Sequence, residues 1–218
     1  MLKKIIFAVL FFVSINSFAQ KVPFYDDIQA FKKEDSLKAP IKNPVLFIGS
    51  SSFTKWKTLQ EDFPTIPLMN RAFGGSTLED VIRFQDDVIY KYNPRKIVIY
   101  CGENDIANSE KITPEEVFNR FKTLYKNIRK HYPKIPIVYI SIKPSPSRWQ
   151  LKDKEIETNK LIKTFIKKER NIVFVDIWNQ MLDENGNPKE DIFISDRLHM
   201  NEKGYKIWIE AFKKELKK

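Results

Sequence analysis

Residues 45–53, VLFIGSSSF, place a short apolar run directly before a glycine and three serines. The run has the length of a strand and no polar alternation, which indicates a strand covered on both faces. Comparable apolar runs occupy residues 66–70, 96–101, 135–142 and 172–176. A helix and lead-in occupy residues 20–44, and further helical patterns occupy 76–92, 113–131, 152–169 and 201–218. This alternation predicts an α/β fold built on a five-stranded parallel sheet.

The sequence also marks the start of two helices. S-T-L-E at residues 76–79 and T-P-E-E at residues 113–116 are capping boxes, the second with proline at the first helical position. The segments KPSPSRW (143–149) and DENGNP (183–188) read as a loop and a turn. The sequence contains neither an internal repeat nor a linker, so residues 20–218 are predicted to form a single domain.

The first twenty residues, MLKKIIFAVLFFVSINSFAQ, differ in character from the rest of the chain. A basic start, an apolar run over residues 5–13 and a small-x-small pattern predict a signal peptide of residues 1–19, cleaved after Ala19. The apolar run is much shorter than the roughly 20 residues that span a bilayer, although an uncleaved anchor is the alternative. We therefore expect an exported protein, periplasmic or secreted, with no transmembrane segment after cleavage.

Charge and composition restrict the partners. The formal net charge of +10 falls to +8 once Lys3 and Lys4 leave with the signal peptide. The lysines are scattered along helices, without the clusters of arginine and aromatic residues that nucleic acids favour, so no nucleic-acid partner is expected. One cysteine and two histidines exclude an intrachain disulfide and a zinc site of the usual type. We expect no metal and no cofactor; the oligomeric state is not indicated.

Chemically useful residues follow the predicted strands. Ligands bind outside the carboxyl ends of the strands in open parallel sheets. The segments at this edge are GSSSF (49–53) after the first strand, NRAFGGST (70–77) after the second, GEND (102–105) after the third and DRLH (196–199) past the fifth. We expect these four segments to share one site.

This combination of residues suits acyl transfer by a serine nucleophile. A serine hydroxyl needs a histidine to take its proton, and the histidine needs an acid to fix its tautomer. Asp196 and His199, three residues apart, can supply that pair. A loop glycine N–H, an asparagine amide and the serine's own N–H can stabilise the oxyanion. Each feature alone is common in loops, but together at successive strand ends they predict a catalytic site.

The four segments resemble the conserved blocks of the SGNH (GDSL-type) hydrolases. GSSS matches the first block, with Ser51 in the position of the nucleophile. Gly75 and Asn104 match the oxyanion residues of the second and third blocks, so the implied oxyanion hole comprises Ser51, Gly75 and Asn104. DRLH matches the last block, with Asp196 and His199 as the remaining triad members.

The resemblance covers about residues 43–212 and implies a flavodoxin-like three-layer α/β/α sandwich and a serine esterase that needs no cofactor. One residue departs from the family pattern, because Ser50 stands where the family usually has aspartate. With Ser50 the block no longer reads G-D-S, but the nucleophile position is still a serine, so activity is still expected. A role for Ser51 as a helix N-cap alone is the simpler alternative.

Other classes fit the sequence less well. A lipase of the α/β-hydrolase type requires G-x-S-x-G, but the fifth residue here is Phe53. A flavodoxin-type redox protein requires a phosphate-binding loop in place of GSSSF. A carbohydrate-binding protein derived from an inactive hydrolase would normally lack a triad member. An acyltransferase with the same triad remains open.

The substrate is predicted from export, short connections and one aromatic residue. The connections at the strand ends are too short to form an apolar lid over a long acyl chain. Trp149 can stack on a sugar at the edge of the site, beside Arg148, or it can instead pack into the core. We therefore predict a small-molecule or glycan ester substrate, most simply an acetylated carbohydrate. A lysophospholipase-like enzyme is the alternative.

Overall fold

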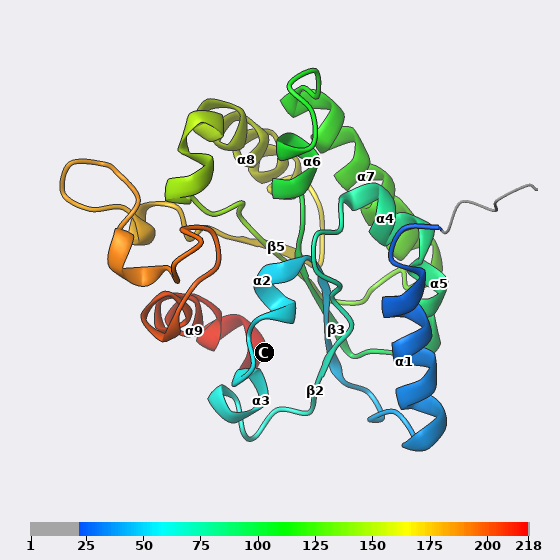
Figure 1. The fold of residues 1–218 in the computed structure, drawn as a ribbon. Coiled ribbons are helices and arrows are strands. Elements are labelled where there is room, and N and C mark those ends of the chain that lie inside the picture. Colours follow the sequence, from blue (N-terminus) through cyan, green and yellow to red (C-terminus); the bar gives the residue numbers. More distant parts are fainter. Residues whose placement is uncertain (1–21, 218) are drawn as a thin grey trace, which may run out of the picture.

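The computed structural model of the chain describes residues 22–217, so the predicted signal peptide and domain start lie outside the described residues. Five parallel strands form one sheet in the order β2-β1-β3-β4-β5 (Figure 1). The strands are β1 (Val45–Gly49), β2 (Leu68–Asn70), β3 (Lys96–Tyr100), β4 (Ile137–Ile140) and β5 (Ile172–Val175). This is the flavodoxin-like order, so the predicted fold class is confirmed.

Helices cover both faces of the sheet (Figure 1). One face packs against α1 (Tyr25–Leu37), α4 (Leu78–Arg83), α5 (Gln85–Val88), α7 (Pro114–His131) and α8 (Lys152–Ile166). The other packs against α2 (Ser51–Thr54), α3 (Leu59–Asp62) and α9 (Glu202–Lys217). Short helices α6 (Glu103–Ala107), η1 (Tyr90–Tyr92), η2 (Pro146–Leu151), η3 (Asn179–Met181) and η4 (Glu190–Ile192) complete the chain.

Alternate residues of each central strand enter different cores. In β1, Leu46 and Ile48 join the core under α7, whereas Val45 and Phe47 join the core under α9. All four are completely buried, which explains why the strand reads as a continuous apolar run. Within residues 22–217, no helix combines the length and apolar character that a membrane crossing needs.

Two helical predictions need correction. The predicted helix over residues 76–92 is divided into α4, α5 and η1, because the backbone leaves helical geometry at Phe84 (φ −104°, ψ 15°). There the Phe84 ring packs edge-on against Phe73 in the core. The capping box is also displaced by one residue, with Thr77 and Asp80 as the reciprocal partners. The capping box predicted for α7, with Thr113 and Glu116, is confirmed.

Strands β2 and β4 are shorter than predicted. β2 lies at the edge of the sheet and pairs with β1 only from Leu68 to Asn70. β4 ends at Ile140, and beyond it the backbone of Ile142 pairs with a side chain instead of a strand. Asn159 Oδ1 accepts the Ile142 N–H at 2.8 Å, and Asn159 Nδ2 donates to the Ile142 C=O at 2.9 Å. The predicted loop of residues 143–149 contains the start of η2.

Candidate active site

Ser51 lies at the carboxyl end of β1, as the first residue of α2. The preceding Gly49 has φ +121°, and a Cβ there would lie 2.0 Å from the carbonyl oxygen of Tyr100, so only glycine fits. Two residues after Ser51, the buried Phe53 ring packs against Trp208 of α9, with ring centroids 5.9 Å apart. The strand end and this aromatic contact fix the short helix that carries Ser51.

Ser51, His199 and Asp196 form a continuous hydrogen-bonded chain. His199 Nε2 lies 2.8 Å from Ser51 Oγ, and His199 Nδ1 lies 2.6 Å from Asp196 Oδ2. The other carboxylate oxygen of Asp196 accepts the backbone N–H groups of Leu198 and His199, each at 2.9 Å. These bonds close a tight turn in which Arg197 adopts a left-handed conformation (φ +57°).

The turn also sets the protonation of the pair. Partial burial opposes ionisation of Asp196, but the hydrogen bonds and charge of His199 and the N–H of Leu198 lower its pKa to about 2. An ionised carboxylate can only accept hydrogen bonds, so His199 Nδ1 carries the proton. His199 Nε2 is then an acceptor directed at the Ser51 hydroxyl, as a general base requires.

The predicted oxyanion residues Gly75 and Asn104 lie beside the segment that carries Ser51. A Cβ built at Gly74 would lie 3.8 Å from Ser51 Cβ, and the adjoining Gly75 has φ +86°, so this turn packs against the serine. Asn104, on α6, donates its Nδ2–H groups to Ser50 Oγ at 2.7 Å and to the Ser76 carbonyl at 3.0 Å. The backbone N–H groups of Ser51 and Gly75 donate to no acceptor within residues 22–217.

Hydrogen bonds tie the glycine turn to its neighbours. Ser76 Oγ donates to the carbonyl of Gly49 at 2.9 Å, at the end of β1. Asp105, completely buried, accepts the N–H of Leu78 and one N–H of Arg120, both at 2.9 Å. Burial raises the pKa of Asp105, and these two donors offset part of that effect. The turn is therefore fixed to the ends of β1 and β3.

Arg148 and Trp149, the predicted substrate-binding pair, lie on η2. Arg148 Nη1 donates to Asn104 Oδ1 at 3.0 Å and lies 3.3 Å from Glu103 Oε1, so this side chain contacts a predicted oxyanion residue. Trp149 is half-buried and lies outside both cores. Its ring stacks on Trp178, with centroids 6.1 Å apart and planes at 25°. A substrate role for either residue stays a prediction.

The sequence analysis missed a buried group of charges behind Asn104. Lys143 Nζ lies 2.8 Å from both carboxylate oxygens of Glu103, and the Tyr100 hydroxyl donates to Glu103 Oε2 at 2.5 Å. Glu155 of α8 is also completely buried nearby. Neither Glu103 nor Lys143 is among the site residues predicted from the sequence. The available signal was their shared position, since both follow strand ends at the same edge of the sheet.

The comparison with protein families agrees with this geometry. The GDSL-like lipase/acylhydrolase family matches residues 48–207, well over half of the chain, and the chain belongs to this family. It is therefore an ester-hydrolysing serine hydrolase by class. The match begins inside β1 and ends inside α9, so it contains all four segments that resemble the family blocks.

Solved structures with the same fold are numerous but distant in sequence. A GDSL-like lipase of Bacteroides thetaiotaomicron is 23% identical, with 87% of this chain and 97% of that chain covered and a TM-score of 0.72. A catalytic mutant of an acetylxylan esterase from Geobacillus stearothermophilus is 15% identical, with coverages of 80% and 94% and a TM-score of 0.64. A carbohydrate esterase family 3 protein of Talaromyces cellulolyticus is 14% identical, with coverages of 79% and 95% and a TM-score of 0.62. No curated protein matches the sequence.

Proposed function

We propose that this protein is an exported esterase that removes short acyl groups, above all acetyl groups, from carbohydrates. Ser51 is the nucleophile, His199 the general base and Asp196 the residue that orients it. The observation that carries the proposal is the hydrogen-bonded chain from Ser51 Oγ through His199 to Asp196, with distances of 2.8 and 2.6 Å. Removal of residues 1–19 by cleavage after Ala19 is part of the same proposal.

The reaction proceeds in two acyl-transfer steps. Ser51 Oγ attacks the ester carbonyl while its proton passes to His199 Nε2. The tetrahedral intermediate collapses, the ester C–O bond breaks, and the imidazolium gives its proton to the departing sugar hydroxyl. Water then attacks the acyl-serine, with His199 again taking and returning a proton, and acetate leaves. Asp196 remains ionised throughout, since its pKa is lowered to about 2.

Three donors stabilise the negative oxygen in this proposal. The N–H groups of Ser51 and Gly75 have no acceptor among residues 22–217, so each is available for a substrate oxygen. The third donor is Asn104 Nδ2, which must exchange one of its two partners. Ser50 Oγ is the partner that can yield, because a hydroxyl rotates about a single bond whereas the Ser76 carbonyl is fixed in the backbone.

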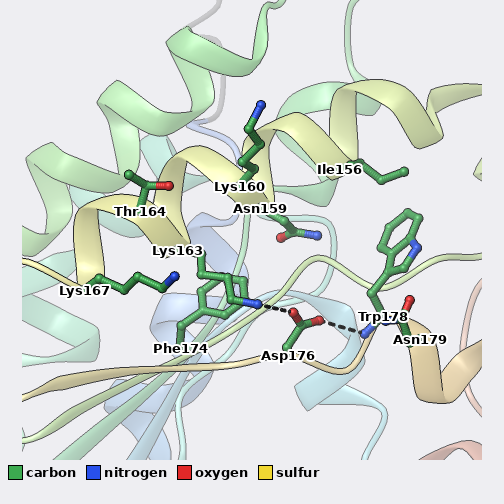
Figure 2. A pocket seen from close by; sticks show the side chains of 10 residues that line it. All are labelled: Ile156, Asn159, Lys160, Lys163, Thr164, Lys167, Phe174, Asp176, Trp178 and Asn179. Atoms are coloured by element: carbon green, nitrogen blue, oxygen red, sulfur yellow. Dashed lines mark hydrogen bonds and ion pairs between the residues drawn. The ribbon is translucent and has the colours of Figure 1, made fainter.

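Two tryptophans support a carbohydrate as the leaving group. Trp149 and Trp178 form a half-buried stacked pair beside Arg148, and Lys152 Nζ lies 4.9 Å from the centroid of the Trp149 ring. The partly exposed Trp178 indole suits the apolar face of a sugar ring. Trp178 also lines one end of a groove of about 470 Å³ between α8 and the segment after β5 (Figure 2). Most of the other residues that line this groove are polar, Asn159, Lys163 and Asp176 among them, although Ile156 and Phe174 also contribute. Two structural relatives carry the names of carbohydrate esterases.

The substrate is tested by comparing acyl chain lengths and sugars. The purified protein is assayed on nitrophenyl esters of two to twelve carbons and on acetylated xylo-oligosaccharides. We expect the highest kcat/KM on the acetyl ester and release of acetate from the oligosaccharides. Trp178→Ala should raise KM for the oligosaccharide and leave nitrophenyl acetate hydrolysis unchanged. A preference for chains of eight carbons or more, with no acetate released from any glycan, would favour a lysophospholipase-like enzyme instead.

Two further measurements separate the remaining alternatives. Expression of the full chain in a bacterial host, with mass spectrometry of the exported product, should give an N-terminus at Gln20. Retention of residues 1–19 in the membrane fraction would indicate an uncleaved anchor. Hydrolysis in the presence of a free sugar should give acetate as the main product, whereas predominant transfer of the acetyl group to that sugar would indicate an acyltransferase.

A further inference from the structure

The Asn104 amide has only one orientation compatible with its neighbours. Arg148 can only donate hydrogen bonds, so its contact at 3.0 Å selects the amide oxygen, Oδ1. The Ser76 carbonyl can only accept, so its contact at 3.0 Å selects the amide nitrogen, Nδ2. Removal of Arg148 would leave one of these two constraints and would leave Oδ1 without its cationic donor.

We propose that Arg148 is a positioning residue, which orients the Asn104 amide and strengthens Nδ2–H as the oxyanion donor. This inference rests on the proposed function, because it assigns Arg148 a role in the same oxyanion hole. A cation that hydrogen-bonds to Oδ1 withdraws electron density from the amide and makes its N–H groups better donors. Arg148 thereby acts on the reaction through Asn104, without touching the substrate.

Arg148 is itself held by a buried anion. Glu103, only 5% exposed, receives Lys143 Nζ at 2.8 Å and the Tyr100 hydroxyl at 2.5 Å, and Arg148 Nη1 lies 3.3 Å away. Burial alone would raise the pKa of Glu103, but the charges of Lys143 and Arg148 and these hydrogen bonds lower it overall. The carboxylate is therefore ionised, and it anchors the guanidinium against Asn104.

The charges behind Asn104 do not cancel at neutral pH. Burial, together with repulsion from Glu103, raises the pKa of Glu155 to about 8, against the attraction of Lys143 and Arg148. Both carboxyl oxygens of Glu155 also lack a hydrogen-bond partner among the described residues, which fits an uncharged group better than a carboxylate. With Glu155 protonated, two cations face one anion. The excess positive charge lies at the Oδ1 end of the Asn104 amide, where it favours negative charge developing beside Nδ2–H.

A double-mutant cycle tests the proposal. Arg148→Met, Asn104→Ala and the double variant are assayed on nitrophenyl acetate, a small neutral ester. We expect Arg148→Met to lower kcat by about 10–100-fold with KM nearly unchanged, the size of effect typical for loss of a hydrogen bond to a charged group. In the Asn104→Ala background the same change should lower kcat by no more than about 2-fold, because its target is gone. Arg148→Lys should restore part of the rate.

Two results would overturn the proposal. Equal losses from Arg148→Met in both backgrounds would show that Arg148 acts independently of Asn104. A rise in KM with unchanged kcat would show that it binds the substrate directly. Arg95→Met, at an exposed position just before β3, is the matched control and should change neither constant. If Arg148→Met does not fold, as judged by thermal unfolding, Arg148→Lys and Arg148→Gln are carried through the same cycle.

The same samples distinguish this inference from the proposed function. A fluorophosphonate probe should label Ser51 in the wild-type protein. Absence of both labelling and ester hydrolysis in the wild type would mean that the proposed function is wrong. Labelling and hydrolysis in the wild type, combined with additive effects in the cycle, would mean that only the role of Arg148 is wrong.

Discussion

Asp196 and His199 come from one turn of four residues, whereas the Asn104 amide is held by Ser50, Ser76 and Arg148 from three separate segments. The Asp196 side chain is 41% exposed, but Asn104 is only 7% exposed. The proposed base side of the site, Asp196 and His199, is thus a local feature of one turn, whereas the proposed oxyanion side around Asn104 depends on packing between segments. Substitutions on the two sides should therefore differ in their effects on stability as well as on rate.

The expected difference in stability follows from the different solvent exposure of the two sides. The Asp196 side chain is 41% exposed and its contact with the neutral His199 ring is a single hydrogen bond, which contributes little net stability, so this pair can be altered with little effect on folding. Breaking a buried charge pair leaves one charge without a partner and costs several kcal/mol. Glu103, Lys143 and Arg148 form such a group behind Asn104. We therefore expect purely chemical defects on the base side and combined defects on the oxyanion side.

The largest loss of activity is expected from substitution of Ser51, the proposed nucleophile. Ser51→Ala should lower kcat by about 10⁵–10⁶-fold, because no nucleophile remains for His199 to activate. Its thermal midpoint should stay close to that of the wild type, since Ser51 is only half-buried and its side chain makes one hydrogen bond, to His199. Ser52→Ala is the control and should keep most of the activity. Fluorophosphonate labelling of Ser52 in the wild type, located by mass spectrometry, would contradict the assignment.

The base side is tested by Asp196→Asn. An amide at this position would donate to His199 Nδ1 and force the proton onto Nε2, so the ring could no longer accept from Ser51. We expect kcat to fall by about 10³–10⁴-fold with an unchanged midpoint of unfolding. Asp191→Asn removes a neighbouring exposed carboxylate and should leave the rate intact. A loss of less than 10-fold for Asp196→Asn would mean that another group orients His199.

The oxyanion side is tested by Asn104→Ala, with an expected loss of about 10²–10³-fold in kcat and little change in KM. In contrast to Asp196→Asn, this variant should also unfold at a lower temperature, because three hydrogen bonds are lost from a buried site. Asn108→Ala, at an exposed position just after α6, is the control. Full activity in Asn104→Ala would exclude its proposed role.

The buried charges give a pH effect on stability. The pKa of Glu155 is raised from 4.5 to about 8, in surroundings formed by Glu103, Lys143, Arg148 and Tyr100. Between these two pH values the unfolded chain has released the proton and the folded protein retains it. Stability from this group is therefore complete below about pH 4.5 and is lost as the pH rises through 8.

Glu155→Gln should remove that dependence. Its thermal midpoint relative to the wild type should become more favourable from pH 5 to pH 9, as measured by circular dichroism at constant ionic strength. Glu157→Gln, on the same helix with a side chain 40% exposed, should show no such trend. A constant difference between the Glu155 variant and the wild type across this range would mean that Glu155 is already ionised at pH 5.

The smallest effect is expected from chelation. Residues 22–217 contain no group of three or more His, Cys, Asp or Glu side chains arranged to hold a metal ion. Activity on nitrophenyl acetate should therefore be unchanged after treatment with EDTA and removal of the chelator. If EDTA abolishes activity and added Mg²⁺ or Ca²⁺ restores it, the reaction depends on a metal ion and the proposed mechanism is incomplete.

Features set by neighbouring residues were predictable from the sequence. The apolar runs located all five strands, because a strand buried on both faces must be apolar throughout. The Thr113–Glu116 capping box also predicted the start of α7, because its two hydrogen bonds join residues only three positions apart. Where a distant contact intervened, prediction failed: Phe84 turns into the core against Phe73 and divides the helix, and Asn159 ends β4 by bonding to Ile142.

The sequence by itself determined the sheet, the strand-end position of Ser51 and the spacing of Asp196 and His199, since each depends on a few consecutive residues. Only the tertiary structure decided the surroundings of Asn104. Lys143 meets Glu103 because β3 and β4 are neighbours in the sheet, and Arg148 meets Asn104 because η2 packs on α6. A charged side chain carries no local sign of its partner, so its role depends on which segments the fold brings together.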